Sequence, residues 1–173
     1  MNLSVPLHGS RVCATPAETQ AFGRLLGAAA QPGDVIVLDG PLGAGKTTLT
    51  QGIAAGMGVS GRVTSPTFVL ARQHQSQVGG PCGPSLIHVD LYRLLDGATS
   101  ADLLGELDAL DLDTELDRAV VVAEWGGGVV DHLAQRYLLV TLERETPPGS
   151  ASIDDVFDAD ARVITWRTVD AAD

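Results

Sequence analysis

The stretch from Gly40 to Thr47 constrains this chain more than any other part of its sequence. It reads Gly-Pro-Leu-Gly-Ala-Gly-Lys-Thr and matches the phosphate-binding pattern G-x-x-x-x-G-K-[ST] at every fixed position. Its glycines permit backbone dihedrals that point successive N–H groups at phosphate oxygens. Lys46 is placed to reach the β and γ phosphates, and the Thr47 hydroxyl has the length needed to contact Mg²⁺. The pattern predicts a nucleotide-binding loop.

The segments on either side of this loop have the character that the motif requires. Asp34 to Asp39 is an apolar, β-branched run after a Pro-Gly turn, which is typical of a buried parallel strand. Thr48 to Met57 carries apolar residues at helical spacing, and Gly56 or Gly58 offers a left-handed stop. Lys46 is also the only lysine among the 11 cationic residues. The alternative is a glycine-rich turn that matches by chance, but strand, loop and helix follow in the required order.

Length and composition predict a single domain. With 173 residues, 45% of them hydrophobic, the chain is expected to build one core over residues 1–173, with residues 1–9 and 168–173 as disordered tails. The net charge of -11 disfavours direct binding to nucleic acid, because such binding depends on Lys and Arg releasing counterions from phosphate. Two cysteines, no signal-peptide pattern and no apolar run of membrane length predict a cytoplasmic protein without membrane contact.

The remaining pattern predicts an α/β fold. Thr15-Pro16-Ala17-Glu18 is a capping box that starts a helix running to about Ala30. Ser10 to Ala14 is predicted to be a short edge strand, and residues 137–142 and 162–166 alternate well enough to be antiparallel edge strands. Together these elements indicate a three-layer P-loop NTPase-like fold, with a central, mainly parallel sheet, antiparallel edge strands and flanking helices.

Two further apolar runs each end in a carboxylate. One runs from Ser85 to Asp90, and the other runs from Ala119 to Glu124 and is followed by Trp125. Ligands of open α/β sheets lie beyond the carboxyl ends of the strands, so both acids are well placed for Mg²⁺ or its water shell. Each acid taken alone is equally explained as a solvated strand end or a helix cap. Their recurrence at equivalent places beside a phosphate loop favours a functional role for both.

Three other segments are less specific. Thr64, Ser65 and Thr67 are explained by turn and strand propensity, with a switch that senses the γ-phosphate as the alternative. Gln73 to Pro84 is rich in Gln, Gly and Pro and is predicted to be a mobile surface loop. Thr99 to Arg118 interleaves acids with leucines, which predicts short amphipathic helices with a solvated acidic face, or alternatively a surface for a basic partner.

The sequence also narrows the class of P-loop protein. GTPases read guanine through an Asn-Lys-x-Asp motif, but the only asparagine here is Asn2 and the only lysine lies in the loop. Small-molecule kinases of this length close a lid with paired arginines over the transferred phosphate, whereas these arginines are scattered with no adjacent pair. Guanine recognition by that motif is therefore excluded, and a kinase is disfavoured.

Four motifs together carry a family resemblance. In chain order they are Gly40-Pro-Leu-Gly-Ala-Gly-Lys-Thr-Thr48, Thr64-Ser-Pro-Thr-Phe68, His88-Val-Asp-Leu-Tyr-Arg-Leu94 and Val122-Ala-Glu-Trp125. In this order and at these separations, they resemble the bacterial TsaE (YjeE) family. The resemblance covers roughly residues 10 to 145, and its second and third motifs are far more specific than the phosphate loop, which many families share.

This resemblance implies a small ATPase required for the threonylcarbamoyl modification of adenosine 37 (t6A37) in tRNAs that read ANN codons. Members of the family act with the TsaD and TsaB proteins and bind at the TsaB–TsaD heterodimer. They hydrolyse ATP to keep that complex turning over, without transferring the carbamoyl group themselves. Contact with tRNA would be indirect, through the partners, which agrees with the acidic charge of this chain.

The resemblance also implies roles for single residues. Lys46 would hold the phosphates, and Thr47 and Glu124 would hold Mg²⁺. Asp90 would orient or deprotonate the attacking water, although Asp90 and Glu124 are interchangeable in these two roles. The catalytic set implied is therefore Lys46, Asp90 and Glu124, with ATP and Mg²⁺ as cofactors.

The nucleotide contacts implied by the resemblance extend beyond the loop. Ser65 and Thr67 would belong to the switch that responds to the γ-phosphate, and Trp125 would lie close to the nucleotide. The full set implied comprises Gly40, Leu42, Gly43, Ala44, Gly45, Lys46, Thr47, Thr48, Ser65, Thr67 and Trp125.

One position departs from the family pattern, and two other functions stay open. The family often has Asp at the second loop position, where Pro41 lacks both an N–H and a carboxylate. No arginine finger is evident in the sequence, and Arg93 is the best internal candidate. The predicted ATPase is therefore slow alone and stimulated by its partners. The alternatives are a nucleotide-gated binding module for which hydrolysis is incidental, and a small-molecule kinase.

Overall fold

The computed structural model describes residues 7–61, 63–66, 71–78, 84–91, 117–125, 134–144 and 161–170, and every structural statement below refers to these parts. They contain two helices and seven strands. In chain order the elements are β1 (His8–Cys13), α1 (Pro16–Ala29), β2 (Val35–Asp39), α2 (Lys46–Gly56), β3 (Ala71–Gln75), β4 (Ser85–Asp90), β5 (Ala119–Glu124), β6 (Arg136–Arg144) and β7 (Arg162–Asp170).

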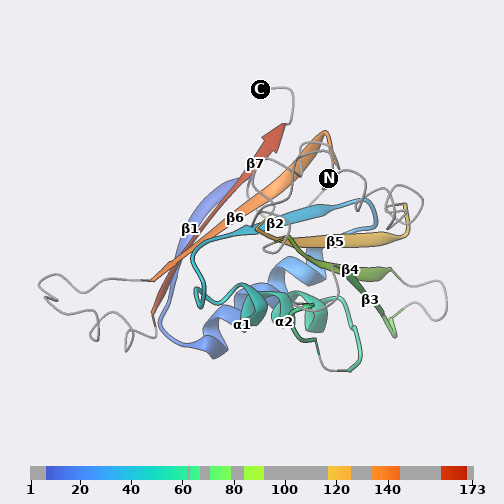
Figure 1. Ribbon diagram of the computed structural model, residues 1–173, viewed down its shortest axis with the longest axis horizontal. Coiled ribbons are helices and arrows are strands. Elements are labelled where there is room, and N and C mark those ends of the chain that lie inside the picture. The colour runs from blue at the N-terminus through green and yellow to red at the C-terminus, as the bar shows by residue number, and fades with distance from the viewer. Residues whose placement is uncertain are drawn as a thin grey trace, which may run out of the picture.

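The seven strands form one sheet in the order β1-β7-β6-β2-β5-β4-β3 (Figure 1). Its centre is parallel, because β6, β2, β5 and β4 run in one direction. β3 pairs antiparallel with β4, and β7 pairs antiparallel with both β6 and β1. The predicted α/β fold with a mainly parallel central sheet is confirmed. The prediction that β6 and β7 are edge strands is wrong, because β1 covers the outer side of β7 and β2 pairs with β6.

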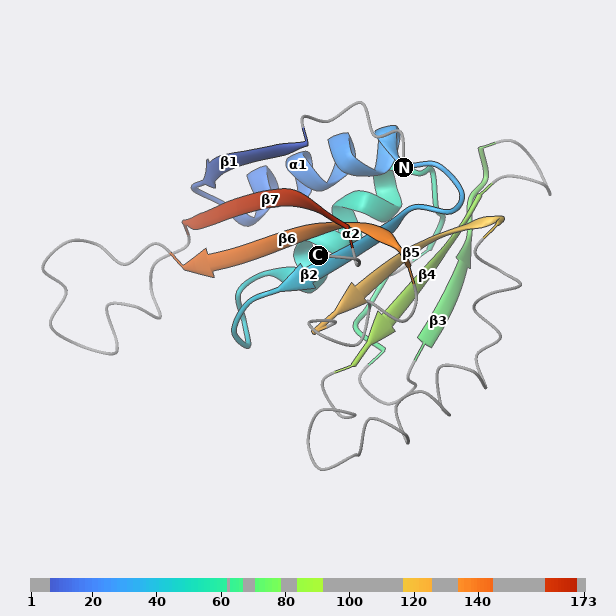
Figure 2. The ribbon, with the colours of Figure 1, turned by 90° about the horizontal axis from the view of Figure 1, so that it is seen from above.

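Both helices lie side by side against one face of the sheet (Figure 1, Figure 2). Leu26 of α1 and Ile53 of α2 are fully buried in a cluster with alternate strand residues such as Ile36. The intervening strand residues, including Val37 and Val121, form a second buried cluster, because successive residues of a strand point to opposite faces. Burial on both faces explains the continuous apolar runs of the central strands.

The ends of both helices follow from local chemistry. The Thr15 hydroxyl accepts a hydrogen bond from the Glu18 N–H at 3.2 Å, and the Glu18 carboxylate accepts one from the Ala14 N–H at 3.0 Å. This reciprocal cap confirms the predicted start of the first helix. The second helix ends at Gly56, and Gly58 has a φ of +72°, as predicted for a left-handed stop.

Glycines bring the two helices into close contact. A Cβ built on Gly27 would lie 2.0 Å from the carbonyl oxygen of Ile53, and one built on Gly23 would lie 2.5 Å from a carbonyl oxygen of α2. Gly52 and Gly56 are equally crowded against the backbone of α1. The two backbones therefore touch where any side chain would separate them. This contact fixes the position of α2, the helix that follows the phosphate loop.

Replacing Gly27 by alanine is expected to lower the free energy of unfolding by about 2 kcal/mol, because the added methyl group forces the helix backbones apart. The better helix propensity of alanine offsets only about 1 kcal/mol of the strain. Urea unfolding followed by circular dichroism measures the change. Leu25→Ala, at a position of α1 that is 58% exposed, is the control and should change stability by less than about 0.5 kcal/mol. A Gly27→Ala variant as stable as the wild type would contradict this close packing.

Three predicted boundaries are wrong. Residues 8–9 and 168–170 belong to β1 and β7 rather than to disordered tails, because they pair along the β1–β7 and β6–β7 ladders. Residues 73–75, predicted to begin a mobile loop, pair with β4 as part of β3.

Three predicted features lie outside the described residues: Thr67, Arg93 and the acidic segment over 99–116. Neither helix in the described ranges is long and apolar enough to cross a membrane.

Candidate nucleotide site

The loop between β2 and α2 has the backbone conformation that phosphate binding needs. Gly40, Gly43 and Gly45 have φ values of +138°, +73° and +105°, in a region that residues with a Cβ rarely adopt. At Gly40 a side chain would also collide with the carbonyl oxygen of Leu142, which lies 2.3 Å from the position of its Cβ. The geometry of the loop therefore explains why glycine occupies these positions.

The start of α2 offers unpaired N–H groups. The first hydrogen bond that closes the helix runs from the Leu49 N–H to the Gly45 carbonyl at 2.9 Å. In the described parts of the chain, no group accepts a hydrogen bond from the N–H groups of Gly45, Lys46 or Thr47. Such groups form the positive end of the helix dipole and suit a phosphate oxygen.

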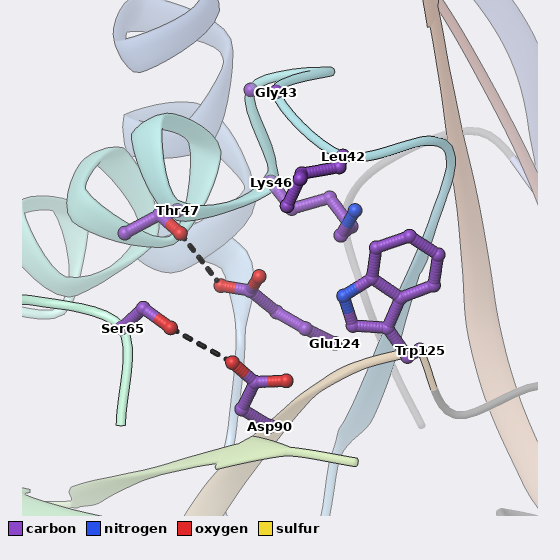
Figure 3. Close-up of a pocket in the computed structure, with 9 residues that line it drawn as sticks. Leu42, Gly43, Lys46, Thr47, Ser65, Asp90, Glu124 and Trp125 are labelled. Atoms are coloured by element: carbon purple, nitrogen blue, oxygen red, sulfur yellow. Dashed lines mark hydrogen bonds between the residues drawn. The ribbon is translucent and has the colours of Figure 1, made fainter. Parts of the chain in front are cut away.

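Lys46 extends back toward the start of the loop (Figure 3). Its Nζ donates to the carbonyl oxygens of Gly40 at 2.7 Å and Pro41 at 3.0 Å, and lies 3.6 Å from the centre of the Trp125 ring. Burial lowers the pKa of the Lys46 ammonium, and nearby carboxylates act in the opposite direction, that of Glu124 most strongly. Phosphate oxygens would be stronger acceptors for this buried ammonium than the two neutral carbonyls.

Pro41 takes part in the hydrogen bonds of the loop through its own carbonyl group. That carbonyl accepts hydrogen bonds from the Lys46 ammonium and, at 3.1 Å, from the Ala44 N–H. The preceding N–H, of Gly40, donates to the Asp39 carboxylate at 2.8 Å. Proline therefore fits this turn although it brings neither an N–H nor a carboxylate of its own.

Two carboxylates face the loop from neighbouring strands. Asp90 and Glu124 are directly opposite each other in the parallel β4–β5 register, and both are buried. The Thr47 hydroxyl donates to Glu124 Oε1 at 3.1 Å, and the Ser65 hydroxyl donates to Asp90 Oδ2 at 2.8 Å (Figure 3). Each acid that ends a strand therefore accepts a hydrogen bond from a hydroxyl group, one at the start of α2 and one in the segment 63–66.

His88 holds Glu124 from within the core. It precedes Asp90 by two residues on the same face of β4, is fully buried, and places Nε2 2.8 Å from Glu124 Oε1. Its Nδ1 has no partner in the described parts of the chain. In this contact Nε2 is the donor, because a carboxylate oxygen can only accept a hydrogen bond. The sequence pattern predicts no role for His88, although its spacing from Asp90 predicts that the two side chains share a face.

A strained turn places the indole at this site. Trp125 has a φ of +65° and is the only residue other than glycine with a positive φ in the described ranges. The backbone N–H of Trp125 donates to the Leu38 carbonyl at 3.0 Å, which holds the chain in this conformation at the end of β5. Backbone strain of this kind is maintained only where the surrounding structure enforces it. Here the turn brings the ring beneath the Lys46 ammonium (Figure 3).

One cavity of about 290 Å³ collects most of the predicted site residues. Of the predicted nucleotide contacts, Gly40, Ala44 and Thr48 do not line it, and Thr67 lies outside the described residues. The lining consists of Leu42, Gly43, Gly45, Lys46, Thr47, Ser65, Asp90, Glu124 and Trp125.

The donors in this cavity suit a hard divalent cation that arrives with a nucleotide. Mg²⁺ prefers oxygen ligands and is usually held by one or two carboxylates together with substrate phosphates. The Thr47 hydroxyl and the Glu124 carboxylate supply such oxygens, with Asp90 on the adjoining strand. Within the described ranges, no group of three or more His, Cys, Asp and Glu could hold a metal ion. Water and phosphate oxygens would complete the coordination of a metal held here.

Two arginines that sequence analysis did not connect with the site also reach the phosphate loop. Arg144 ends β6 and donates to the Gly43 carbonyl at 3.2 Å, and Arg162 begins β7 and donates to the Ala44 carbonyl at 2.9 Å. Nothing in their local sequence marks them, because their nearness to the loop depends on the pairing of distant strands.

Comparison with known proteins agrees with this geometry. Residues 13–152 match the family model described as "Threonylcarbamoyl adenosine biosynthesis protein TsaE". The relative named tRNA threonylcarbamoyladenosine biosynthesis protein TsaE in Mycobacterium leprae is 50% identical over 165 residues, which cover 95% of this chain and 94% of the relative. A relative with the same name in Mycobacterium tuberculosis is 53% identical over 149 residues, or 86% of this chain and 80% of the relative.

A solved structure supports the same assignment. The crystal structure of Bacillus subtilis YdiB aligns with a TM-score of 0.65 and 29% identity, covering 94% of this chain and 85% of that one. The family model extends over most of the chain, and it includes the phosphate loop and both carboxylates. This chain therefore belongs to the TsaE family.

Proposed function

We propose that this chain is a Mg²⁺-dependent ATPase that acts with TsaD and TsaB in the formation of t6A37 in tRNA. The observation that carries the proposal is the single cavity in which the phosphate loop meets the Thr47–Glu124 and Ser65–Asp90 pairs. Membership of the TsaE family supports a role in t6A37 formation, since the relatives of this chain are named for threonylcarbamoyladenosine biosynthesis.

Each group in the cavity would have a distinct role. Lys46 and the N–H groups at the start of α2 would hold the β and γ phosphates. Thr47 and Glu124 would hold Mg²⁺, which when bound supplies positive charge to the phosphate oxygens. Asp90 would orient the attacking water or accept its proton. Ser65, hydrogen-bonded to Asp90, would couple that carboxylate to the presence of the γ-phosphate.

Charge and topology support a division of labour among the proteins. The net charge of -11 disfavours direct contact with tRNA, so the partners would hold the RNA. We treat residues 1–173 as one ATPase domain, because β1 and β7, from the two ends of the chain, pair within the same sheet. This domain would act in the cytoplasm. The whole chain would then dock as one unit on the TsaB–TsaD heterodimer.

Phosphate release from ATP tests this proposal directly. We expect slow release by the chain alone and at least about tenfold faster release with the TsaB–TsaD pair, because positioning and charge stabilisation dominate phosphoryl transfer. The same mixture containing Lys46→Ala measures any ATPase activity that the partners contribute. Equal rates with and without the pair would contradict activation by assembly. ADP release stimulated by a metabolite, with no partner present, would favour a small-molecule kinase instead.

A further inference from the structure

Arg144 and Arg162 lie directly opposite each other in the antiparallel β6–β7 ladder. Like charges that face each other across a strand pair are destabilising, so this pair needs compensating contacts. The phosphate loop supplies one such contact to each arginine, because the two guanidinium groups donate to the consecutive carbonyls of Gly43 and Ala44. Hydrogen bonds with a charged donor are about twice as strong as neutral ones. A pair that is unfavourable within its own sheet is thus held by the loop beside it.

The contact at Ala44 fixes one peptide plane of the loop. The peptide bonds of the described chain include no cis bond, so the Ala44 carbonyl and the Gly45 N–H point in opposite directions. Arg162 is not part of the cavity lining, whereas Gly45 is. With the carbonyl held by Arg162, the Gly45 N–H therefore points away from this arginine, and Gly45 is one of the residues that line the cavity. A guanidinium bound to the carbonyl also polarises the peptide group, which makes its N–H a better donor.

We propose that Arg162, assisted by Arg144, is a positioning residue of the phosphate loop. Its guanidinium sets the peptide that presents the Gly45 N–H to the phosphates of a nucleotide, without contacting the phosphates itself. This inference rests on the proposed nucleotide function and adds to it a residue beyond the 13–152 match to the family model. The antiparallel extension of the sheet thereby takes part in phosphate binding.

A merely structural role for Arg162 predicts a different outcome. Its Nη1 also donates to the Ala161 carbonyl at 3.1 Å, so its loss would lower stability even if the loop were unaffected. That role alone would shift the unfolding midpoint and leave the affinity for phosphate unchanged. Affinity measured well below the unfolding temperature separates the two roles.

The test compares the ADP affinity of the full chain with that of Arg162→Ala and Arg167→Ala. Arg167 is exposed and lies on the other face of the same strand, so its replacement makes the same charge change away from the loop. Titration calorimetry is expected to show binding at least about tenfold weaker for Arg162→Ala and within about twofold of wild type for Arg167→Ala. Arg162→Lys keeps the charge without the planar fork and should fall between them.

The NMR resonance of the Gly45 amide proton measures directly whether this N–H donates to a bound phosphate. Inorganic pyrophosphate is expected to move its resonance downfield in the wild type, because a hydrogen bond to an anion deshields the proton, and less so in Arg162→Ala. Wild-type ADP affinity in Arg162→Ala, or weaker affinity with an unchanged Gly45 shift, would overturn the proposal. If Arg162→Ala does not fold, the Gly45 shift and the ADP affinity of Arg162→Lys decide. A wild-type chain that binds no ADP would overturn the proposed function too, so the two failures are distinguishable.

Discussion

Lys46→Ala is expected to weaken ATP binding by at least about 100-fold. In the bound state the ammonium would exchange its two carbonyl partners for phosphate oxygens, and a charge-assisted hydrogen bond contributes roughly 1.5–3 kcal/mol. No other lysine can replace it, because Lys46 is the only one in the chain. Titration calorimetry with ATP and Mg²⁺ measures the loss. The rise in Tm that nucleotide binding produces should disappear in parallel.

The variant should still fold without nucleotide. The lowered pKa of Lys46 means that the folded state binds this proton less tightly than the unfolded chain does. The charged side chain therefore lowers the free energy of unfolding at neutral pH. This cost decreases as the pH rises from the pKa of Lys46 in the folded state to its higher pKa in the unfolded chain. Arg136→Ala, at an exposed position of β6, is the control for the change in charge. Unchanged ATP affinity in Lys46→Ala would refute the phosphate site.

Asp90→Asn is expected to bind ATP and Mg²⁺ normally but to hydrolyse ATP at least about 100-fold more slowly. An amide cannot accept the proton of the attacking water as a carboxylate does. The asparagine oxygen can still accept the Ser65 hydroxyl, now 2.8 Å from Asp90 Oδ2, so the local structure should persist. Phosphate release at saturating ATP with the TsaB–TsaD pair, compared with affinity from calorimetry, measures the effect.

Glu124→Gln is the matched variant on the neighbouring strand. Glutamine can still accept the Thr47 hydroxyl, but its neutral amide is a weaker ligand for Mg²⁺ than a carboxylate. The replacement is therefore expected to raise the Mg²⁺ concentration that half-maximal hydrolysis requires. If Asp90→Asn changed the Mg²⁺ requirement and Glu124→Gln changed only the rate, the two carboxylates would have exchanged roles. Hydrolysis at the wild-type rate in both variants would refute the catalytic assignment.

Asp90→Asn also separates the ATPase from a nucleotide-gated binding module. In a reconstituted modification of tRNA, a variant that binds ATP without cleaving it should fail to sustain t6A37 formation if hydrolysis drives the cycle. Full modification with this variant would favour the binding module.

The amino-acid sequence determined the parts of this protein that are local or periodic. The conformation of Gly40 to Thr47 is encoded by its own glycines, because their positive φ values are closed to most other residues. The start of α1 is encoded by the hydroxyl of Thr15 three residues before Glu18. Asp90 and Glu124 were predictable neighbours, because the carboxyl ends of adjacent parallel strands meet at one edge of a sheet.

Only the tertiary structure decided which distant groups complete the site. Arg144 and Arg162 are scattered in the sequence, and the antiparallel register of β6 and β7 places them together beside the loop. The contact of His88 with Glu124 depends in the same way on the pairing of β4 with β5. The ammonium of Lys46 meets an indole only through the left-handed turn at Trp125. Such contacts require distances that are correct to a few tenths of an ångström. Strand register and helix packing set these distances through the whole fold, so no local sequence pattern encodes them.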